Sequence, residues 1–190
     1  MGSPKHMLPY TDARPIYKHL LERILLACPT IGDLCISLPK NGPDLDALEL
    51  TCAERIIKLL RDSDTDIGPA AGLLAAHAYE PEAHWLVVAC DYPLMSAKEL
   101  RRLAESYSPP ITCFKNVDGW VEPLLAVWGP EAFHVLQSNV NRGMNGPKNV
   151  VRTMNGTSLQ PIDEVALLNT NTMDAWQHAL DLSRDVNLTD

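Results

Sequence analysis

The segment "HWLVVACD", residues 84–91, constrains the fold of this chain more than any other. It places six apolar residues in a row, which is typical of a strand that is buried on both faces in a parallel sheet. The run ends at Asp91, and Pro93 follows shortly after. Because open α/β sheets bind ligands at the carboxyl ends of their strands, Asp91 is a candidate site residue from its position alone.

Segments typical of helices and strands alternate along the rest of the chain. Apolar periodicity predicts helices at residues 14–28, 73–80, 96–107, 130–138, 150–154 and 173–184, and strands at 33–39, 84–91, 110–116, 122–129 and 164–171. Residues 47–62 are ambiguous: we expect a helix of about two turns and then a strand over 56–62, although one continuous helix also fits. The alternation predicts an α/β protein with a mostly parallel, doubly wound sheet in one domain, residues 1–190, with a flexible tail at 184–190.

The composition bounds the class of protein. The chain has 190 residues, 46% of them hydrophobic, which is enough for a sizeable core. A net charge of -8 argues against nucleic acid or an anionic membrane as the partner. The five cysteines form no C-x-x-C pair, which favours reduced thiols over a disulfide framework or a zinc site. No segment resembles a membrane span or a signal peptide, so we expect a cytoplasmic protein.

Three stretches offer candidate functional side chains, each with a competing structural interpretation. Asp91 suits Mg²⁺, which prefers one or two carboxylates plus substrate phosphates, but it could equally cap the following turn. In "DSDTDIGPAAG", residues 62–72, the small residues at the start of a helix admit a flat base and the free helix N–H groups favour anions, although most Gly-Pro turns are only turns. Only one of its three carboxylates is expected to matter.

Lys5 and the segment Asn169–Thr170–Asn171 are the other candidates. Lys5 is the single cation of the opening stretch and could contact a nucleotide phosphate, although a solvent-facing lysine is the commoner outcome. The segment "NTN" lies between a predicted strand and a predicted helix, where it could face a ligand or cap the helix. The residues alone leave both alternatives open.

Taken together and in order, "MGSPKHMLPY", "DIGPAAGLLAA", "WLVVACDYPLMS", "VEPLLAVW" and "LLNTNTMDAW" resemble the MobA-like nucleotidyltransferases, and among them the molybdenum cofactor guanylyltransferases. The resemblance covers essentially the whole chain. It implies a three-layer α/β/α sandwich with a Rossmann-like sheet of the nucleotide-diphospho-sugar transferase type. It also implies transfer of GMP from GTP to molybdopterin or the molybdenum cofactor, with release of pyrophosphate and with Mg²⁺, or Mn²⁺ in its place, as the metal ion.

The resemblance also assigns roles to individual residues. Lys5 corresponds to the lysine that contacts phosphate, and Asp91 corresponds to the magnesium ligand, so these two are the expected catalytic residues. The expected nucleotide-binding residues are Lys5, Ser37, Asp62, Gly68, Pro69, Gly72 and Asp91. The expected acceptor-binding residues are Glu122, Pro123, Asn169 and Asn171.

The chain also departs from the family pattern. The family's first strand and the Gly-Gly half of its nucleotide loop are missing before "MGSPK", Ser37 stands where the family often has Asn, and Met173 stands where it usually has Pro. We therefore expect the chain to be poorly stable or inactive alone. Two alternatives stay open: cytidylyl or other nucleotidyl transfer by the same fold, and an inactive remnant that acts as a binding module. Proteins of molybdenum cofactor biosynthesis, or proteins that receive the cofactor, are the expected partners.

Overall fold

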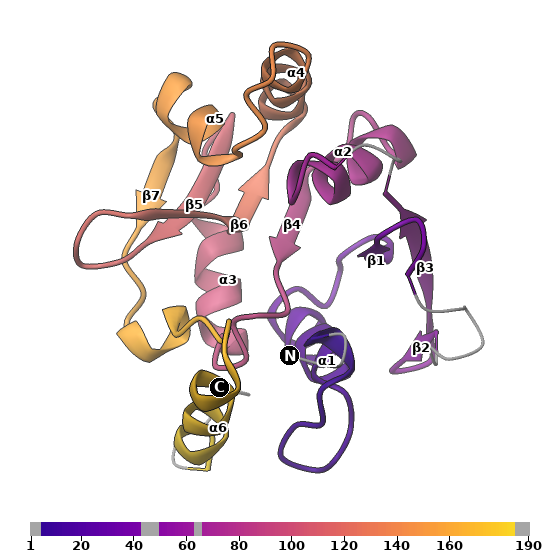
Figure 1. Cartoon of the computed structure of the whole chain (residues 1–190), viewed down its shortest axis with the longest axis vertical. Coiled ribbons are helices and arrows are strands. Elements are labelled where there is room, and N and C mark those ends of the chain that lie inside the picture. The colour runs from indigo at the N-terminus through magenta and orange to yellow at the C-terminus, as the bar shows by residue number, and fades with distance from the viewer. Residues whose placement is uncertain (1–4, 43–49, 63–65, 185–190) are drawn as a thin grey trace.

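The computed structural model describes residues 5–42, 50–62 and 66–184, and its strands form two sheets (Figure 1). The first sheet contains β1 (Leu34–Leu38), β2 (Thr51–Cys52) and β3 (Arg55–Arg61), and the second contains β4 (Trp85–Val88), β5 (Ile111–Lys115), β6 (Val121–Trp128) and β7 (Thr157–Leu159). The helices are α1 (Ile16–Ala27), α2 (Ala70–Tyr79), α3 (Ala97–Glu105), α4 (Pro130–Val140), α5 (Lys148–Thr153) and α6 (Met173–Leu182), with 3₁₀ turns η1 (Lys5–Met7) and η3 (Glu164–Leu167). Of the predicted tail, residues 185–190 lie outside the described residues.

The two sheets are mixed. Their strand orders are β1-β3-β2 and β4-β6-β5-β7; β1 is parallel to β3 and β5 to β7, whereas β2 is antiparallel to β3 and β6 is antiparallel to both of its neighbours. The predicted α/β class is confirmed, but the pairing is less parallel than expected. A short turn with Gly119 at a φ of +82° joins β5 to β6, and so short a connection allows only an antiparallel pair.

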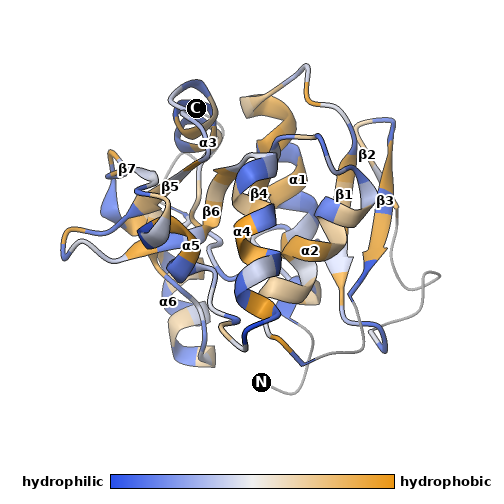
Figure 2. Ribbon diagram, turned by 90° about the horizontal axis from the view of Figure 1, so that it is seen from above, coloured by the Kyte–Doolittle hydropathy of each residue, from blue (hydrophilic) through white to orange (hydrophobic). Residues whose placement is uncertain are grey.

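Helices cover the sheets on two faces. One core cluster joins α1 and α3 to the sheets and includes Leu21, Leu100 and Leu125. A second cluster joins α2, α4 and α5 to the opposite face and includes Leu73 and Phe133. Figure 2 shows α2 coloured as hydrophobic over most of its length, as a helix that packs against a sheet requires. None of the described helices has the length and apolar composition needed to cross a membrane.

Apart from the helix expected before residue 56, the predicted helices are present with small shifts at their ends. Ser96 caps α3 by accepting a hydrogen bond from the backbone N–H of Glu99, as the capping-box pattern indicates. Helix α2 begins at Ala70, three residues earlier than predicted, because the turn at Gly68 and Pro69 starts it. The predicted loop "MGSPK" lies outside the described residues except for Lys5.

Two sequence predictions are wrong. The predicted helix before residue 56 is a β-hairpin where it is described, since β2 pairs with β3 through Ala53 and Glu54, whose positive φ angles cannot continue a right-handed helix. The predicted strand over 164–171 begins instead as the 3₁₀ turn η3, which Asp163 caps by accepting from the N–H of Val165. The last strand of the sheet is β7, at residues 157–159, where the sequence indicated no strand.

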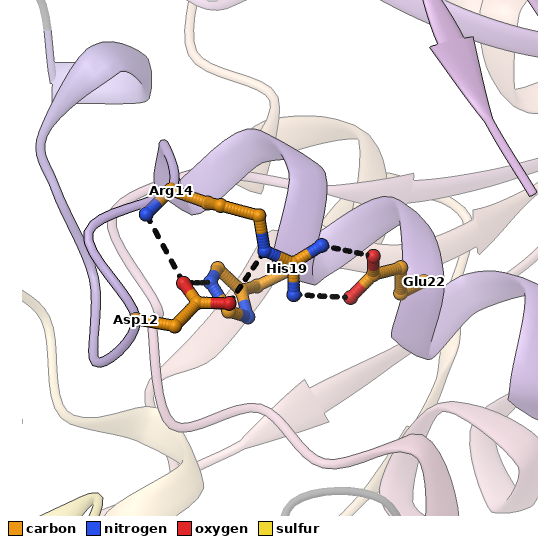
Figure 3. Close-up of polar contacts among 4 residues, drawn as sticks. All are labelled: Asp12, Arg14, His19 and Glu22. Atoms are coloured by element: carbon orange, nitrogen blue, oxygen red, sulfur yellow. Dashed lines mark hydrogen bonds and ion pairs between the residues drawn. The ribbon is translucent and has the colours of Figure 1, made fainter.

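Charged residues fix the chain ahead of α1 (Figure 3). Arg14 donates hydrogen bonds to both Asp12 and Glu22, and Nε2 of His19 lies 2.7 Å from Oδ1 of Asp12. The pKa of Asp12 is lowered: burial would raise it, but the hydrogen bonds from Arg14 and His19 outweigh that effect. The cluster holds the loop between η1 and α1 in place, and with it the start of the described chain at Lys5.

Candidate functional site

A cavity of about 490 Å³ lies between β1 and β4 and extends past their carboxyl ends. Six of the residues predicted for the nucleotide side line it: Lys5, Ser37, Asp62, Pro69, Gly72 and Asp91. Gly68 is not among the lining residues; with a φ of +60° it makes the turn that starts α2. Residues from five separate stretches of the chain thus meet at one edge of the sheets, as expected of a ligand site in an α/β fold.

Asp91 follows the end of β4 and contacts two of the predicted site residues. The side-chain amide of Asn169 donates to its Oδ2 at 2.9 Å, and Nζ of Lys5 lies 3.9 Å from the same oxygen. Its other oxygen, Oδ1, is buried and has no hydrogen-bond partner among the described residues. The helix that follows, α3, is capped by Ser96 and not by Asp91.

The segment Asn169–Thr170–Asn171 is hydrogen-bonded to Asp91 and Lys5. The backbone N–H and the hydroxyl of Thr170 both donate to the carbonyl oxygen of Asp91, at 2.9 and 3.1 Å. Asn171 accepts a hydrogen bond from Lys5 through its side-chain oxygen. Helix α6 is capped by Thr172, so the two asparagines are not its caps. The asparagines predicted for the acceptor side therefore contact the two residues predicted to be catalytic.

Ser37, Asp62 and Gly72 form the opposite wall of the cavity. The hydroxyl of Ser37 donates to Oδ1 of Asp62 at 2.5 Å, and the backbone N–H of Asp62 donates to the carbonyl of Leu38 at 3.0 Å. The parallel register of β1 and β3 brings these residues together at the strand ends. A Cβ on Gly72 would lie 2.9 Å from Oγ of Ser37, which is closer than real contacts allow. A larger residue at position 72 would therefore displace the Ser37 side chain where α2 approaches β1.

Glu122 and Pro123 lie within β6, as the predicted strand over 122–129 implies, and neither lines the cavity. The hydroxyl of Tyr92 donates to Oε2 of Glu122 at 2.8 Å, and Nζ of Lys148 lies 3.6 Å from Oε1. The carbonyl of Pro123 accepts from the indole N–H of Trp128 at 2.8 Å, next to an irregularity in the β5–β6 register. Pro123 thus has a structural contact, while Glu122 is connected to the site through Tyr92.

Sequence reasoning missed two residues of this region, Tyr92 and His6. Tyr92 adjoins the predicted residue Asp91 in the chain, and that adjacency was the available signal. His6 lines the cavity with its Nε2 buried and unpartnered among the described residues. Burial lowers the pKa of His6, so the ring is neutral at pH 7. Burial, together with the nearby Glu122 carboxylate, raises the pKa of Tyr92, so its hydroxyl remains a donor.

The thiol of Cys90 also lines the cavity. Burial, reinforced by the Asp91 charge, raises its pKa to about 11. The thiolate is the nucleophilic form of cysteine, so Cys90 is protonated and unreactive near pH 7.

The charged residues that line the cavity do not by themselves neutralise a phosphate ligand. Its described lining contains one lysine and two carboxylates, Asp62 and Asp91, so a nucleotide triphosphate needs an added cation. No group of three or more His, Cys, Asp or Glu side chains among the described residues could hold a metal ion. Mg²⁺ suits such a sparse site because it keeps several waters and takes one or two carboxylates plus phosphate oxygens. The buried, unpartnered Oδ1 of Asp91 and the side-chain oxygen of Asn169 fit that requirement.

Comparison with known proteins identifies relatives over most of the chain. The family model described as the MobA-like NTP transferase domain matches residues 1–159. A molybdenum cofactor guanylyltransferase of Pseudomonas fluorescens (strain SBW25) is 27% identical over 176 residues, which are 90% of this chain and 82% of that protein. A molybdenum cofactor biosynthesis bifunctional protein of Synechocystis is 25% identical over 116 residues, 60% of this chain; the chain spans only 33% of the length of that protein.

The fold has a counterpart among solved structures. The molybdopterin-guanine dinucleotide biosynthesis protein A of Archaeoglobus fulgidus superposes with a TM-score of 0.69 at 18% identity, over 97% of this chain and 93% of that one. At this identity the likeness shows a shared fold, and the family match adds the class of enzyme. The chain belongs to the MobA-like NTP transferase domain family and is a nucleotidyltransferase.

Proposed function

We propose that this nucleotidyltransferase moves GMP from GTP to molybdopterin or the molybdenum cofactor and releases pyrophosphate. One observation carries the proposal: Asp91, Lys5, Asn169 and Asn171 converge at the end of β4, beside the cavity that Ser37 and Asp62 also line. The name of the Pseudomonas relative, molybdenum cofactor guanylyltransferase, supports the choice of nucleotide and acceptor.

Asp91 and Asn169 are the residues that would hold Mg²⁺, or Mn²⁺ in its place. The Asp91 carboxylate supplies the charge. The amide of Asn169 holds the side chain of Asp91, and the hydroxyl of Thr170 holds its backbone carbonyl. A bound divalent ion would neutralise phosphate charge that Lys5 alone cannot balance. The divalent ion and Lys5 together would supply the positive charge that a site with two carboxylates needs to bind an anionic substrate.

Lys5 is the residue that would stabilise the departing pyrophosphate. Its side chain is one-third exposed, and its ammonium group is held between Asp91 and Asn171, so it can reach a ligand in the cavity. Phosphoryl chemistry of this kind depends on positioning and charge neutralisation more than on covalent catalysis by the protein. The attacking oxygen belongs to a phosphate of the acceptor that is already ionised, so the reaction needs no general base.

Asp62 is the residue that would select guanine. Guanine carries two adjacent donors, N1–H and the N2 amino group, and one carboxylate can accept from both, whereas cytosine presents a single amino donor. Ser37 fixes the orientation of Asp62 through its hydrogen bond. On the acceptor side, Glu122 offers a carboxylate to the N–H groups of a pterin, with Tyr92 and Lys148 holding it in place.

Binding measurements with an Asp91→Asn variant test the metal assignment. Calorimetry with GTP and Mn²⁺ is expected to show binding by the unsubstituted chain and binding roughly 100-fold weaker in the variant, because the carboxylate charge is lost. The control is Asp118→Asn, which removes an exposed carboxylate from the β5–β6 turn outside the cavity and should leave binding unchanged. Equal Mn²⁺-dependent binding by Asp91→Asn would refute the assignment.

A competition between GTP and CTP tests the choice of base. We expect GTP to displace CTP, and an Asp62→Asn variant to lose most of that preference while keeping its affinity for Mn²⁺. A preference for CTP in the unsubstituted chain would replace guanylyl with cytidylyl transfer and would leave the Asp91 assignment standing.

A further inference from the structure

Hydrogen bonds join Asp91 to Glu122 through two neutral side chains. The amide of Asn169 donates to Oδ2 of Asp91 at 2.9 Å, and the hydroxyl of Tyr92 donates to Oε2 of Glu122 at 2.8 Å. Burial raises the pKa of Tyr92 most, and the amide of Asn169, which donates to the hydroxyl oxygen, acts in the opposite direction. We call Asp91, Asn169, Tyr92 and Glu122 the four-residue network.

The direction of each hydrogen bond in the four-residue network follows from its two ends. A carboxylate can only accept hydrogen bonds, and Asp91 and Glu122 are both carboxylates. A tyrosine hydroxyl has one proton, which Tyr92 donates to Glu122, so its oxygen is left to accept. An asparagine amide has two N–H donors. Asn169 thus donates one to Asp91 and one to Tyr92, and each of these protons has an acceptor.

The four-residue network fixes which way round the amide of Asn169 lies. A half-turn of the amide exchanges Oδ1 and Nδ2, and only Nδ2 can donate. Because acceptors on Asp91 and Tyr92 both hold Nδ2, Oδ1 must face away from them. Oδ1 of Asn169 and Oδ1 of Asp91 are buried and have no hydrogen-bond partner among the described residues. Free oxygens of this kind suit a hard cation such as Mg²⁺.

The ring and the hydroxyl of Tyr92 have different surroundings. Tyr92 is 5% exposed and belongs to the core cluster that includes Leu125. Apolar packing in that cluster needs the ring alone, which phenylalanine would also supply. The hydroxyl adds the connection between Asn169 and Glu122, and its two hydrogen bonds offset the cost of burying a polar group.

We propose that Tyr92 is a positioning residue, whose hydroxyl orients the Asn169 amide and so presents Oδ1 of Asn169, with Oδ1 of Asp91, to a divalent ion. This role rests on the proposed metal site but not on the choice of nucleotide or acceptor. Residues that orient metal ligands typically change metal affinity by about 10- to 100-fold when they are replaced. The segment after β4 would thus supply both a metal ligand and the group that orients its partner.

Tyr92→Phe tests the proposal, because it removes the hydroxyl and keeps the ring. The first measurement is NMR of the Asn169 side-chain amide in the metal-free chain, with the signal assigned by its loss in Asn169→Ala. One of the two amide protons should exchange with water about tenfold faster in Tyr92→Phe, since it loses its acceptor. This measurement needs neither metal nor nucleotide, so its outcome is independent of the proposed function.

The second measurement is the affinity for Mn²⁺ at saturating GTP, followed by electron paramagnetic resonance. Tyr92→Phe should bind the ion about tenfold more weakly than the unsubstituted chain. The matched control is Tyr107→Phe, which removes another buried tyrosine hydroxyl, one outside the cavity and without a hydrogen-bond partner among the described residues. It should change neither the exchange of the Asn169 amide nor the affinity for Mn²⁺.

A double-mutant cycle shows whether Tyr92 acts through Asn169. Asn169→Ala alone should weaken Mn²⁺ binding at least tenfold. Adding Tyr92→Phe should weaken it no further, because the amide that the hydroxyl orients is gone. A purely structural role of the hydroxyl would give the same loss in both backgrounds. Urea unfolding of each variant checks that the fold is retained.

Three results would overturn the proposal. Unchanged exchange of the Asn169 amide in Tyr92→Phe would show that the hydroxyl does not hold it. Equal losses of Mn²⁺ affinity in the two backgrounds of the cycle would make Tyr92 a structural residue only. Both results would leave the proposed function standing. Absence of Mn²⁺-dependent GTP binding in the unsubstituted chain would remove the metal site, and the proposed function with it.

Discussion

Strands β4 and β6 are neighbours in one sheet and lie in different surroundings. Leu125 in β6 is fully buried, with 0% of its side chain exposed, whereas Leu86 in β4 and the rest of its strand are only half buried. The difference arises because, among the described strands, β6 has a partner on each side and β4 has a partner on one side only. The half of the molecule around β5 and β6 is a closed core, and the half around β1 and β4 is an open one.

The candidate site lies on the open half. Lys5, Ser37, Asp62 and Asp91 all line the 490 Å³ cavity between β1 and β4, and none lies in the closed core. Apolar burial in the closed half stabilises the fold, while the open half leaves backbone and polar groups available to ligands. The comparison teaches that stability and ligand binding depend on different parts of the molecule, even within the sheet that β4 and β6 share.

The largest expected effect is on stability and compares two leucines. Leu125→Ala should lower the free energy of unfolding by about 3 kcal/mol, because it leaves a cavity in a closed core. Leu86→Ala should lower the free energy of unfolding by about 1 kcal/mol or less, since Leu86 already lines the cavities between β1 and β4. Urea unfolding of both variants under the same conditions measures the difference. Equal losses would mean that β4 is as enclosed as β6, and the comparison would fail.

A smaller effect is expected at Gly72. In Gly72→Ala the new methyl group would press on Ser37 and move it away from Asp62. We expect GTP affinity to fall about tenfold, equivalent to about 1.4 kcal/mol. Stability should change little, because alanine favours the helix more than glycine does. Calorimetry measures the affinity, and Gly146→Ala, away from the cavity, is the matched control. Unchanged affinity in Gly72→Ala would remove Ser37 and Asp62 from the site.

The smallest expected effect is the pH dependence of the closed half. His77 on α2 stacks on Phe133 of α4, and burial lowers its pKa below the ordinary value of 6.5. Protonation therefore favours the unfolded chain, so this contribution to stability is complete above about pH 6.5 and is lost as the pH falls toward the folded-state pKa. Solvent screens this half-exposed ring, so the loss should stay below about 1 kcal/mol.

Unfolding measurements from pH 7.5 to 5.5 test this sign. His77→Gln should flatten the profile, and His178→Gln, at an exposed position of α6, should leave it unchanged. A profile in which stability rises as the pH falls would contradict the burial argument.

Local sequence signals predicted the elements they control directly. The Ser96–Glu99 capping box and the apolar periodicity of α1 were enough to place those helices. The hairpin at Ala53 and Glu54 could not be predicted, because neither residue type favours the positive φ angle that the turn imposes. The short apolar run after Glu164 fits a strand and a 3₁₀ turn equally well. In the structure it forms the 3₁₀ turn η3, and β7 is the strand that pairs with β5.

Contacts of the site residues could be predicted only in part. Asp91 and Gly72 were candidates from their positions after a strand and at the start of a helix. The hydrogen bond from Asn169 to Asp91 joins residues 78 positions apart, and the ion pair of Glu122 with Lys148 depends on where β6 and α5 pack. The expectation that the chain is poorly stable or inactive alone stays a prediction, which the unfolding and GTP-binding measurements address.

By itself, the sequence determined the α/β alternation, the apolar strand shortly before Asp91 and the small residues that admit α2 to the edge of β1, because each depends on neighbouring residues in the chain. The tertiary structure decided the antiparallel direction of β6, the meeting of the Asn169–Asn171 segment with Lys5 and Asp91, and the cavity between β1 and β4. These features depend on hydrogen bonds and burial between distant segments, and such long-range pairings leave no periodic trace in the order of the residues.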